Sequence, residues 1–92
     1  METEVLMNWE DNAGNNFQLF KEINVADELV YVISSDAVDV SSWGGGCYYC
    51  VDVVSKLSEA LSIFSRIVEN AESANGIVDA DWLIKTFGKS TC

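Results

Sequence analysis

The chain has 92 residues and is 49% hydrophobic, which predicts one folded domain over residues 1–92 and excludes an intrinsically disordered chain. Fifteen acidic residues against five basic ones give a net charge of −10 at pH 7, which argues against direct binding to DNA, RNA or an anionic membrane. The sequence holds no histidine, which excludes Ser-His-Asp and Cys-His catalysis and histidine-ligated metal sites. We therefore expect a protein that is not an enzyme and that binds neither a cofactor nor a metal.

Alternating apolar residues near the N-terminus predict the first strands of an antiparallel sheet. In the first strand, Val5, Met7 and Trp9 are expected on one face. The segment Asp11–Asn16 (DNAGNN) then separates two apolar runs, and its residue types tolerate left-handed backbone angles. We expect it to form a hairpin loop.

Two more strands follow this loop. Residues 17–25 form the second strand, in which Lys21 interrupts an apolar row. The other members of that row are Phe17, Leu19, Ile23 and Val25. The third strand, Glu28–Ser34, carries the run LVYVI, which is typical of a central strand or of one covered on both faces. Residues Asp36–Val40 are expected to extend or border this sheet.

After the glycine run at 44–46, apolar residues recur every third or fourth position, which predicts one long amphipathic helix. Its expected apolar stripe is Cys47, Cys50, Val54, Leu57, Leu61, Phe64, Val68 and Ala71. Its expected polar face is Asp52, Lys56, Glu59, Ser62, Arg66 and Glu69. The pair Asn75-Gly76 is typical of a left-handed helix end.

A short C-terminal helix is expected next, with Asp79 as its N-cap and Gly88 as its stop. The competing interpretation is a strand over residues 78–84. We favour the helix. Together the elements predict an α+β domain, in which a small antiparallel sheet of three to four strands packs against one long amphipathic helix, with a short C-terminal helix.

The negative charge is unevenly distributed along the chain. Residues 1–52 contain ten acidic and one basic side chain, whereas residues 53–92 contain five acidic and four basic ones. We therefore expect the sheet and its loops to present a negative surface that steers cationic partners. The partner-binding residues expected there, with aromatic anchors beside the glycine run, are Glu10, Asp11, Glu22, Asp27, Glu28, Asp36, Asp39, Trp43, Tyr48 and Tyr49.

The motif Cys47-Tyr-Tyr-Cys50, at the start of the expected long helix, resembles the redox motif of thioredoxins and glutaredoxins. The resemblance covers about ten residues, and the chain has no proline for the cis-proline loop of that family. It implies a small thiol oxidoreductase with Cys47 as nucleophile and Cys50 as resolving thiol. We instead expect both cysteines to pack in the core.

The leading functional hypothesis is a non-enzymatic inhibitor, which binds a basic nuclease or nucleic-acid-binding protein and blocks its DNA or RNA site. In size and charge the chain is similar to the small acidic anti-CRISPR and anti-restriction proteins of phages, and to immunity proteins of nuclease toxins. The thiol oxidoreductase and a structural or subunit-interaction module are the alternatives. A free strand edge would also allow a homodimer.

The residues from Met1 to Glu4 lack the positive and apolar segments of a signal peptide. We therefore expect the protein in the cytoplasm, which is the host cytoplasm if the source is viral.

Overall fold

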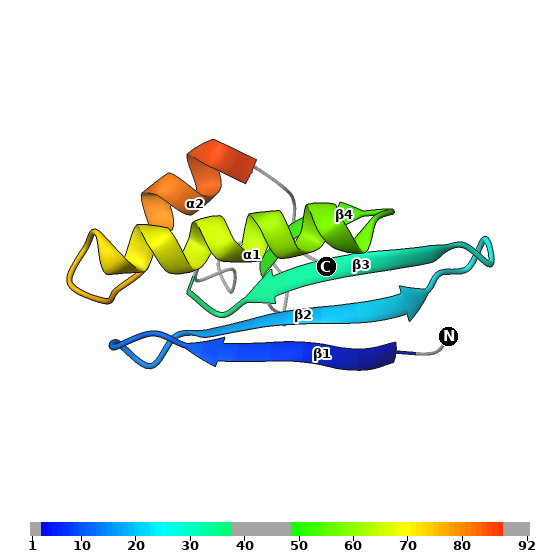
Figure 1. Ribbon diagram of the computed structural model, residues 1–92, viewed down its shortest axis with the longest axis horizontal. Helices are drawn as coiled ribbons and strands as arrows, with labels where there is room; N and C mark the ends of the chain where they lie inside the picture. The colour runs from blue at the N-terminus through cyan, green and yellow to red at the C-terminus, as the bar shows by residue number, and fades with distance from the viewer. Residues whose placement is uncertain (1–2, 38–48, 88–92) are drawn as a thin grey trace.

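A computed structural model describes residues 3–37 and 49–87 (Figure 1). Its elements, in chain order, are β1 (Thr3–Glu10), β2 (Asn16–Ile23), β3 (Leu29–Ser35), β4 (Tyr49–Val54), α1 (Leu57–Glu72) and α2 (Ala80–Phe87). The strands form one antiparallel sheet in the order β1-β2-β3-β4. This arrangement confirms the α+β class and the inner position of the third strand. Neither described helix is long and apolar enough to cross a membrane.

The core lies between one face of the sheet and the two helices. Phe17, Leu19 and Ile33 point from β2 and β3 into it and are fully buried. The buried residues of α1 are Ala60, Phe64, Ile67 and Ala71. Leu83 of α2 and Val51 of β4 complete the same cluster, so α1 and α2 share one core with the sheet.

The first hairpin forms as expected, but its first strand contains a β-bulge. Val5 pairs with Phe20 and Met7 with Leu19, so Leu6 is the inserted residue. Because Phe20 and Leu19 point to opposite faces of β2, Val5 and Met7 also point to opposite faces. The expectation that Val5, Met7 and Trp9 share a face is therefore wrong for Val5, because period-two alternation cannot reveal an inserted residue.

The second strand ends two residues earlier than expected. Asn24 begins the β2–β3 turn, and its side-chain oxygen accepts hydrogen bonds from the backbone N–H groups of Ala26 and Glu28, at 2.9 and 3.0 Å. Asp27 adopts a left-handed backbone with φ of 61°. Val25 is consequently 96% exposed in the turn rather than inward-facing. The asparagine turn thus overrides the apolar alternation.

The expected long helix is two elements, because its first part is the strand β4. Tyr49–Val54 (YCVDVV) is rich in β-branched and aromatic residues, which favour a strand. This segment satisfies the backbone groups on the second edge of β3 through pairs such as Val32 with Val53. Residues 36 and 37 are not a strand, and positions 38–40 lie outside the described residues. The border strand expected at Asp36–Val40 is therefore absent at its first two positions, and β4 borders β3 instead.

The buried face of α1 is rotated from the predicted stripe. Phe64 and Ala71 are buried as expected, but Leu57 and Leu61 are 41% and 43% exposed. The buried positions that the stripe missed are Ala60 and Ile67. The 3.6-residue period does not decide which side of the apolar stripe faces the sheet. Leu57 and Leu61 therefore lie at the exposed border of the buried face of α1. The four predicted polar positions that lie within α1, Glu59, Ser62, Arg66 and Glu69, are exposed as expected.

The short C-terminal helix and the turn before it are confirmed. Asn75 and Gly76 have φ values of 61° and 81°, and the Gly76 N–H donates to the Ala71 carbonyl over 2.7 Å. Asp79 caps α2, because its Oδ1 accepts from the N–H groups of Asp81 and Trp82. The predicted stop at Gly88 lies outside the described residues.

At Gly76 we expect even an alanine substitution to lower the stability of the fold. Besides the positive φ, an added Cβ would collide with the side chain of Asn12. Gly14 provides a matched control, since its φ is 85° but its added Cβ would meet only Glu10 Oε2 at 3.7 Å. We predict that Gly14→Ala lowers the free energy of unfolding by about 1 to 2 kcal/mol and that Gly76→Ala lowers it by about 1 kcal/mol more. Urea denaturation tests this, and equal losses would contradict the Asn12 contact.

Candidate functional site

The β1–β2 turn meets the α1–α2 loop at one end of the molecule (Figure 1). Exposed acidic residues lie in and beside these two segments. The Asn12 N–H donates to the Gly76 carbonyl over 2.8 Å, and Asn12 Nδ2 donates to the Asn75 carbonyl over 3.3 Å. Five acidic residues from β1, the end of β3, the end of α1 and the start of α2 are exposed here. We call them the acidic end: Glu10, Asp36, Glu72, Asp79 and Asp81.

None of these five carboxylates forms an ion pair with a described lysine or arginine. Lys85 lies one helical turn beyond Asp81 on α2 but is not within ion-pair distance of it. Arg66 instead stacks on Phe87, with 5.5 Å between the guanidinium carbon and the ring centroid. The acidic end therefore presents negative charge that the described cations leave uncompensated, and it can accept hydrogen bonds from a partner's lysine or arginine side chains.

Asp36 holds its place in the acidic end through β2. Its Oδ1 accepts from the Asn16 N–H over 2.6 Å, and its Oδ2 accepts from Asn16 Nδ2 over 3.2 Å. The Asp36 N–H also donates to the Asn16 carbonyl. This predicted site residue is thus fixed in position while its side chain remains exposed.

Asp11 is one of the predicted partner-binding residues, but the structure places its side chain inside the fold. Its side chain is buried, and both carboxylate oxygens are occupied within the chain. Oδ1 accepts from the N–H groups of Ala13 and Asn15, each over 2.9 Å. Oδ2 accepts from Asn15 Nδ2 and from the distant Val78 N–H, each over 3.0 Å. Asp11 is therefore a structural link between the β1–β2 turn and the α1–α2 loop.

The environment of Asp11 favours its ionised form. Burial alone would raise the pKa of this carboxyl, but the hydrogen bonds from Asn15, Val78 and Ala13 outweigh burial and hold the pKa below its usual value of 3.8. The charge is thus retained inside the fold because four donors point at it. Sequence composition counts Asp11 among the surface acids, whereas its hydrogen bonds make it part of the framework.

Three other predicted acids lie at the opposite end of the sheet. Glu22 is near the end of β2, and Asp27 and Glu28 lie in the β2–β3 turn. The eight residues of β2, at about 3.3 Å each, separate this remote trio from the acidic end by more than about 20 Å. The predicted acidic residues therefore form two separate groups rather than one surface.

Most of the remaining predicted residues lie outside the part of the chain that the structure describes. Asp39, Trp43 and Tyr48 lie outside the described residues, as does Cys47. Tyr49 begins β4.

Cys50 is half-buried in β4 rather than at a helix start. Cys50, which the thioredoxin resemblance implies as the resolving thiol, therefore does not lie at the start of a helix.

Sequence reasoning missed the contribution of Glu72, Asp79 and Asp81, because they lie in the half of the chain that is almost neutral. A signal was available in Asn75-Gly76, which turns the chain back at the end of α1. Without the long-range bonds of Asp11 and Asn12, however, nothing indicates that this turn meets the β1–β2 turn. Within the described residues, no group of three or more cysteine and carboxylate side chains is arranged to hold a metal ion.

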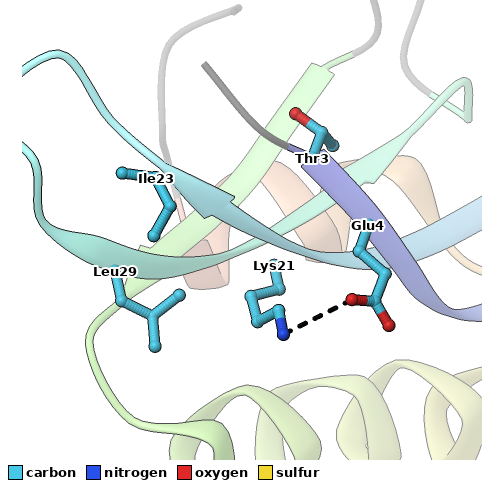
Figure 2. A pocket seen from close by; sticks show the side chains of 5 residues that line it. All are labelled: Thr3, Glu4, Lys21, Ile23 and Leu29. Carbon is cyan, nitrogen blue, oxygen red and sulfur yellow. Dashed lines mark ion pairs between the residues drawn. The ribbon is translucent and has the colours of Figure 1, made fainter.

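A hollow of about 590 Å³ lies at the other end of β1 (Figure 2). Its lining residues are Thr3, Glu4, Lys21, Ile23 and Leu29. Lys21 Nζ lies 3.4 Å from Glu4 Oε1, and this is the only ion pair that joins two described residues. Both partners are exposed, so the pair contributes little to stability. The pair neutralises Lys21, which is the only cation among these lining residues.

No protein-family model, curated protein or solved structure matches this chain.

The role of Asp11 predicts a large effect from a small substitution. Asp11→Asn replaces one carboxylate oxygen, a hydrogen-bond acceptor, with an NH₂ group, a donor. This NH₂ group then faces N–H groups that now donate to Asp11. We predict a loss of about 3 kcal/mol in the free energy of unfolding. Asp27→Asn is the matched control, since Asp27 is exposed and asparagine tolerates its positive φ. Chemical denaturation of both variants measures the difference, and equal stabilities would show that Asp11 does not hold the two loops together.

The stabilisation from Asp11 should also depend on pH. Because the pKa of Asp11 is lowered by folding, its contribution is fully present above the unfolded value near 3.8 and is lost as pH falls through the folded pKa. The stability difference between the wild type and Asp11→Asn should therefore be constant from about pH 7 to about pH 5 and shrink below about pH 4. Urea denaturation across this range tests the sign. A difference that grows on acidification would contradict it.

Proposed function

We propose that this protein is a non-enzymatic inhibitor that binds a basic, nucleic-acid-binding protein in the cytoplasm, such as a nuclease, and blocks its DNA or RNA site. The observation that carries the proposal is the acidic end, where five exposed carboxylates form no ion pair with a described cation. Such a surface suits a groove whose lysine and arginine side chains otherwise bind phosphates.

The carboxylates of the acidic end come from segments that are far apart in sequence. Glu10 ends β1 and Asp36 directly follows β3, whereas Glu72, Asp79 and Asp81 belong to the helical half. Gathering like charges destabilises a fold through repulsion. Solubility of a small domain requires a net charge of only about 2 to 8 in magnitude, and it does not require the charges to be close together. Binding a cationic surface accounts for both the amount and the placement of the charge.

In the proposed complex the acidic end occupies the position of the nucleic-acid backbone. Carboxylate oxygens replace phosphate oxygens as acceptors for lysine and arginine, and no base needs to be imitated because phosphate contacts supply most of the non-specific affinity. The inhibitor and the nucleic acid then compete for the same cations. Binding should accordingly weaken as salt concentration rises.

The charge hypothesis can be tested with two variants that change net charge equally. The first neutralises three members of the acidic end that accept no hydrogen bond from another described residue: Glu10→Gln, Glu72→Gln and Asp81→Asn. The second neutralises the remote trio: Glu22→Gln, Asp27→Asn and Glu28→Gln. The partner is first captured from the native host with the tagged wild-type protein, eluted by rising salt and identified by mass spectrometry.

We predict that the acidic-end variant binds the captured protein about tenfold more weakly at low salt, whereas the remote-trio variant changes affinity less than about threefold. The captured protein should bind DNA or RNA, and added nucleic acid should displace the inhibitor. A partner that is unmoved by both salt and nucleic acid would overturn the proposal. Equal losses in the two variants would show that net charge, and not the acidic end, determines binding.

A further inference from the structure

The strand β1 is an edge of the sheet, and one side of its backbone pairs with no described strand. Except for the half-buried Trp9, every residue of β1 is exposed. Val5, Leu6 and Met7 are apolar members of this row. Proteins commonly protect such an edge with lysine or proline, and β1 contains neither. The protection present is the bulge at Leu6, which leaves Met7–Glu10 as a regular segment paired with residues 16–19 of β2.

An apolar groove of about 350 Å³ runs beside this regular segment, between β1 and the flank of α1. Its lining residues are Met7, Asn8, Trp9, Leu61, Phe64, Ser65 and Val68. Leu61 is 43% exposed and Met7 is 39% exposed, so both apolar side chains lack full cover. A strand added to β1 would place alternate side chains on the face where this groove lies, because side chains alternate along a strand.

Charge indicates what would bind there. Glu10 ends β1 and belongs to the acidic end, so the free edge leads directly into uncompensated negative charge. The described cation nearest to this strand in the sheet is Lys21, which is already paired with Glu4. A second copy of the chain would bring another net charge of −10. The bulge also puts the side chains of Val5 and Met7 on opposite faces of β1. A regular antiparallel pairing with β1 of a second copy therefore cannot extend over both halves of the strand.

We propose that Met7–Glu10 of β1 and the adjacent groove bind an extended segment of a basic partner protein. The segment pairs with the β1 backbone, seats an apolar side chain between Met7 and Leu61, and directs lysine or arginine toward Glu10. This inference deepens the proposed function, on which it rests for the charge of the partner. It adds that the partner contributes a strand with alternating apolar and basic side chains.

The test uses a synthetic peptide of alternating lysine and valine, about eight residues long, as the strand probe. A peptide of the same composition, with all lysines before all valines, is the control for charge. Amide NMR during titration should shift the Met7–Glu10 signals, and hydrogen exchange there should slow. The alternating peptide should bind at least about fivefold more tightly than the block peptide.

Two single substitutions separate the groove from the rest of the surface. Leu61→Gln should weaken binding of the alternating peptide about fivefold, because it removes an apolar wall without changing charge. Val53→Gln is the matched control, since Val53 is 49% exposed on the opposite edge strand β4. Both sites are exposed enough for the variants to fold, which thermal unfolding verifies, and Met7→Gln provides a second test of the same groove.

The possible results distinguish this inference from the proposed function. If both peptides bind equally and shift only residues of the acidic end, the strand site is overturned while the charge proposal stands. If the alternating peptide binds β1 but the acidic-end variant still binds the host partner normally, the charge proposal fails and the strand site survives. Concentration-dependent dimers that Leu61→Gln dissociates would identify a second copy as the occupant, and would overturn the assignment to a basic segment.

Discussion

The four hydrogen bonds accepted by Asp11 hold the two halves of this fold together at one end. Three of the donors lie in the β1–β2 turn itself, and the fourth is the Val78 N–H from the loop that follows α1. A buried carboxylate is costly unless donors surround it, and here they do. Because the fourth bond spans 67 residues, it fixes where the helical half lies relative to the sheet. The Asn12–Gly76 contact, which needs a glycine, lies directly beside it.

This link also determines the electrostatics of the molecule. The same junction that buries one carboxylate brings exposed carboxylates of the sheet and of the helical half to a common end. Their mutual repulsion opposes folding, and the charge-assisted hydrogen bonds of Asp11 offset part of that cost. Screening over about 8 Å at physiological ionic strength leaves such repulsion mainly between close neighbours. The remote trio, more than about 20 Å away, is therefore electrically almost independent of the acidic end.

The sequence predicts correctly those elements that neighbouring residues determine. It does not predict features that depend on residues far apart in the chain. Asn75-Gly76, the Asp79 cap and the turn around Gly14 are local, and each was predicted. Residues 49–54 are predicted as helix because their apolar residues belong to a row spaced three and four apart. The same short segment is also compatible with a strand. The β-branched residues of this segment favour the strand, and pairing with the edge of β3, a tertiary feature, fixes it. The bulge at Leu6 depends on the pairing of β1 with β2, and the position of Asp11 at the junction depends on the Val78 N–H, which is 67 residues away; neither is visible in the local sequence.

The acidic end and the free edge of β1 supply different parts of a binding free energy. Charge acts over several ångströms, so it raises the rate of encounter with any cationic surface and discriminates poorly between such surfaces. Backbone pairing and an apolar groove act only at contact, so they slow dissociation and select a segment of matching pattern. Because β1 ends at Glu10, the two surfaces adjoin at one residue. A partner drawn to the acidic end therefore arrives beside the edge, and the strand contact decides whether it stays.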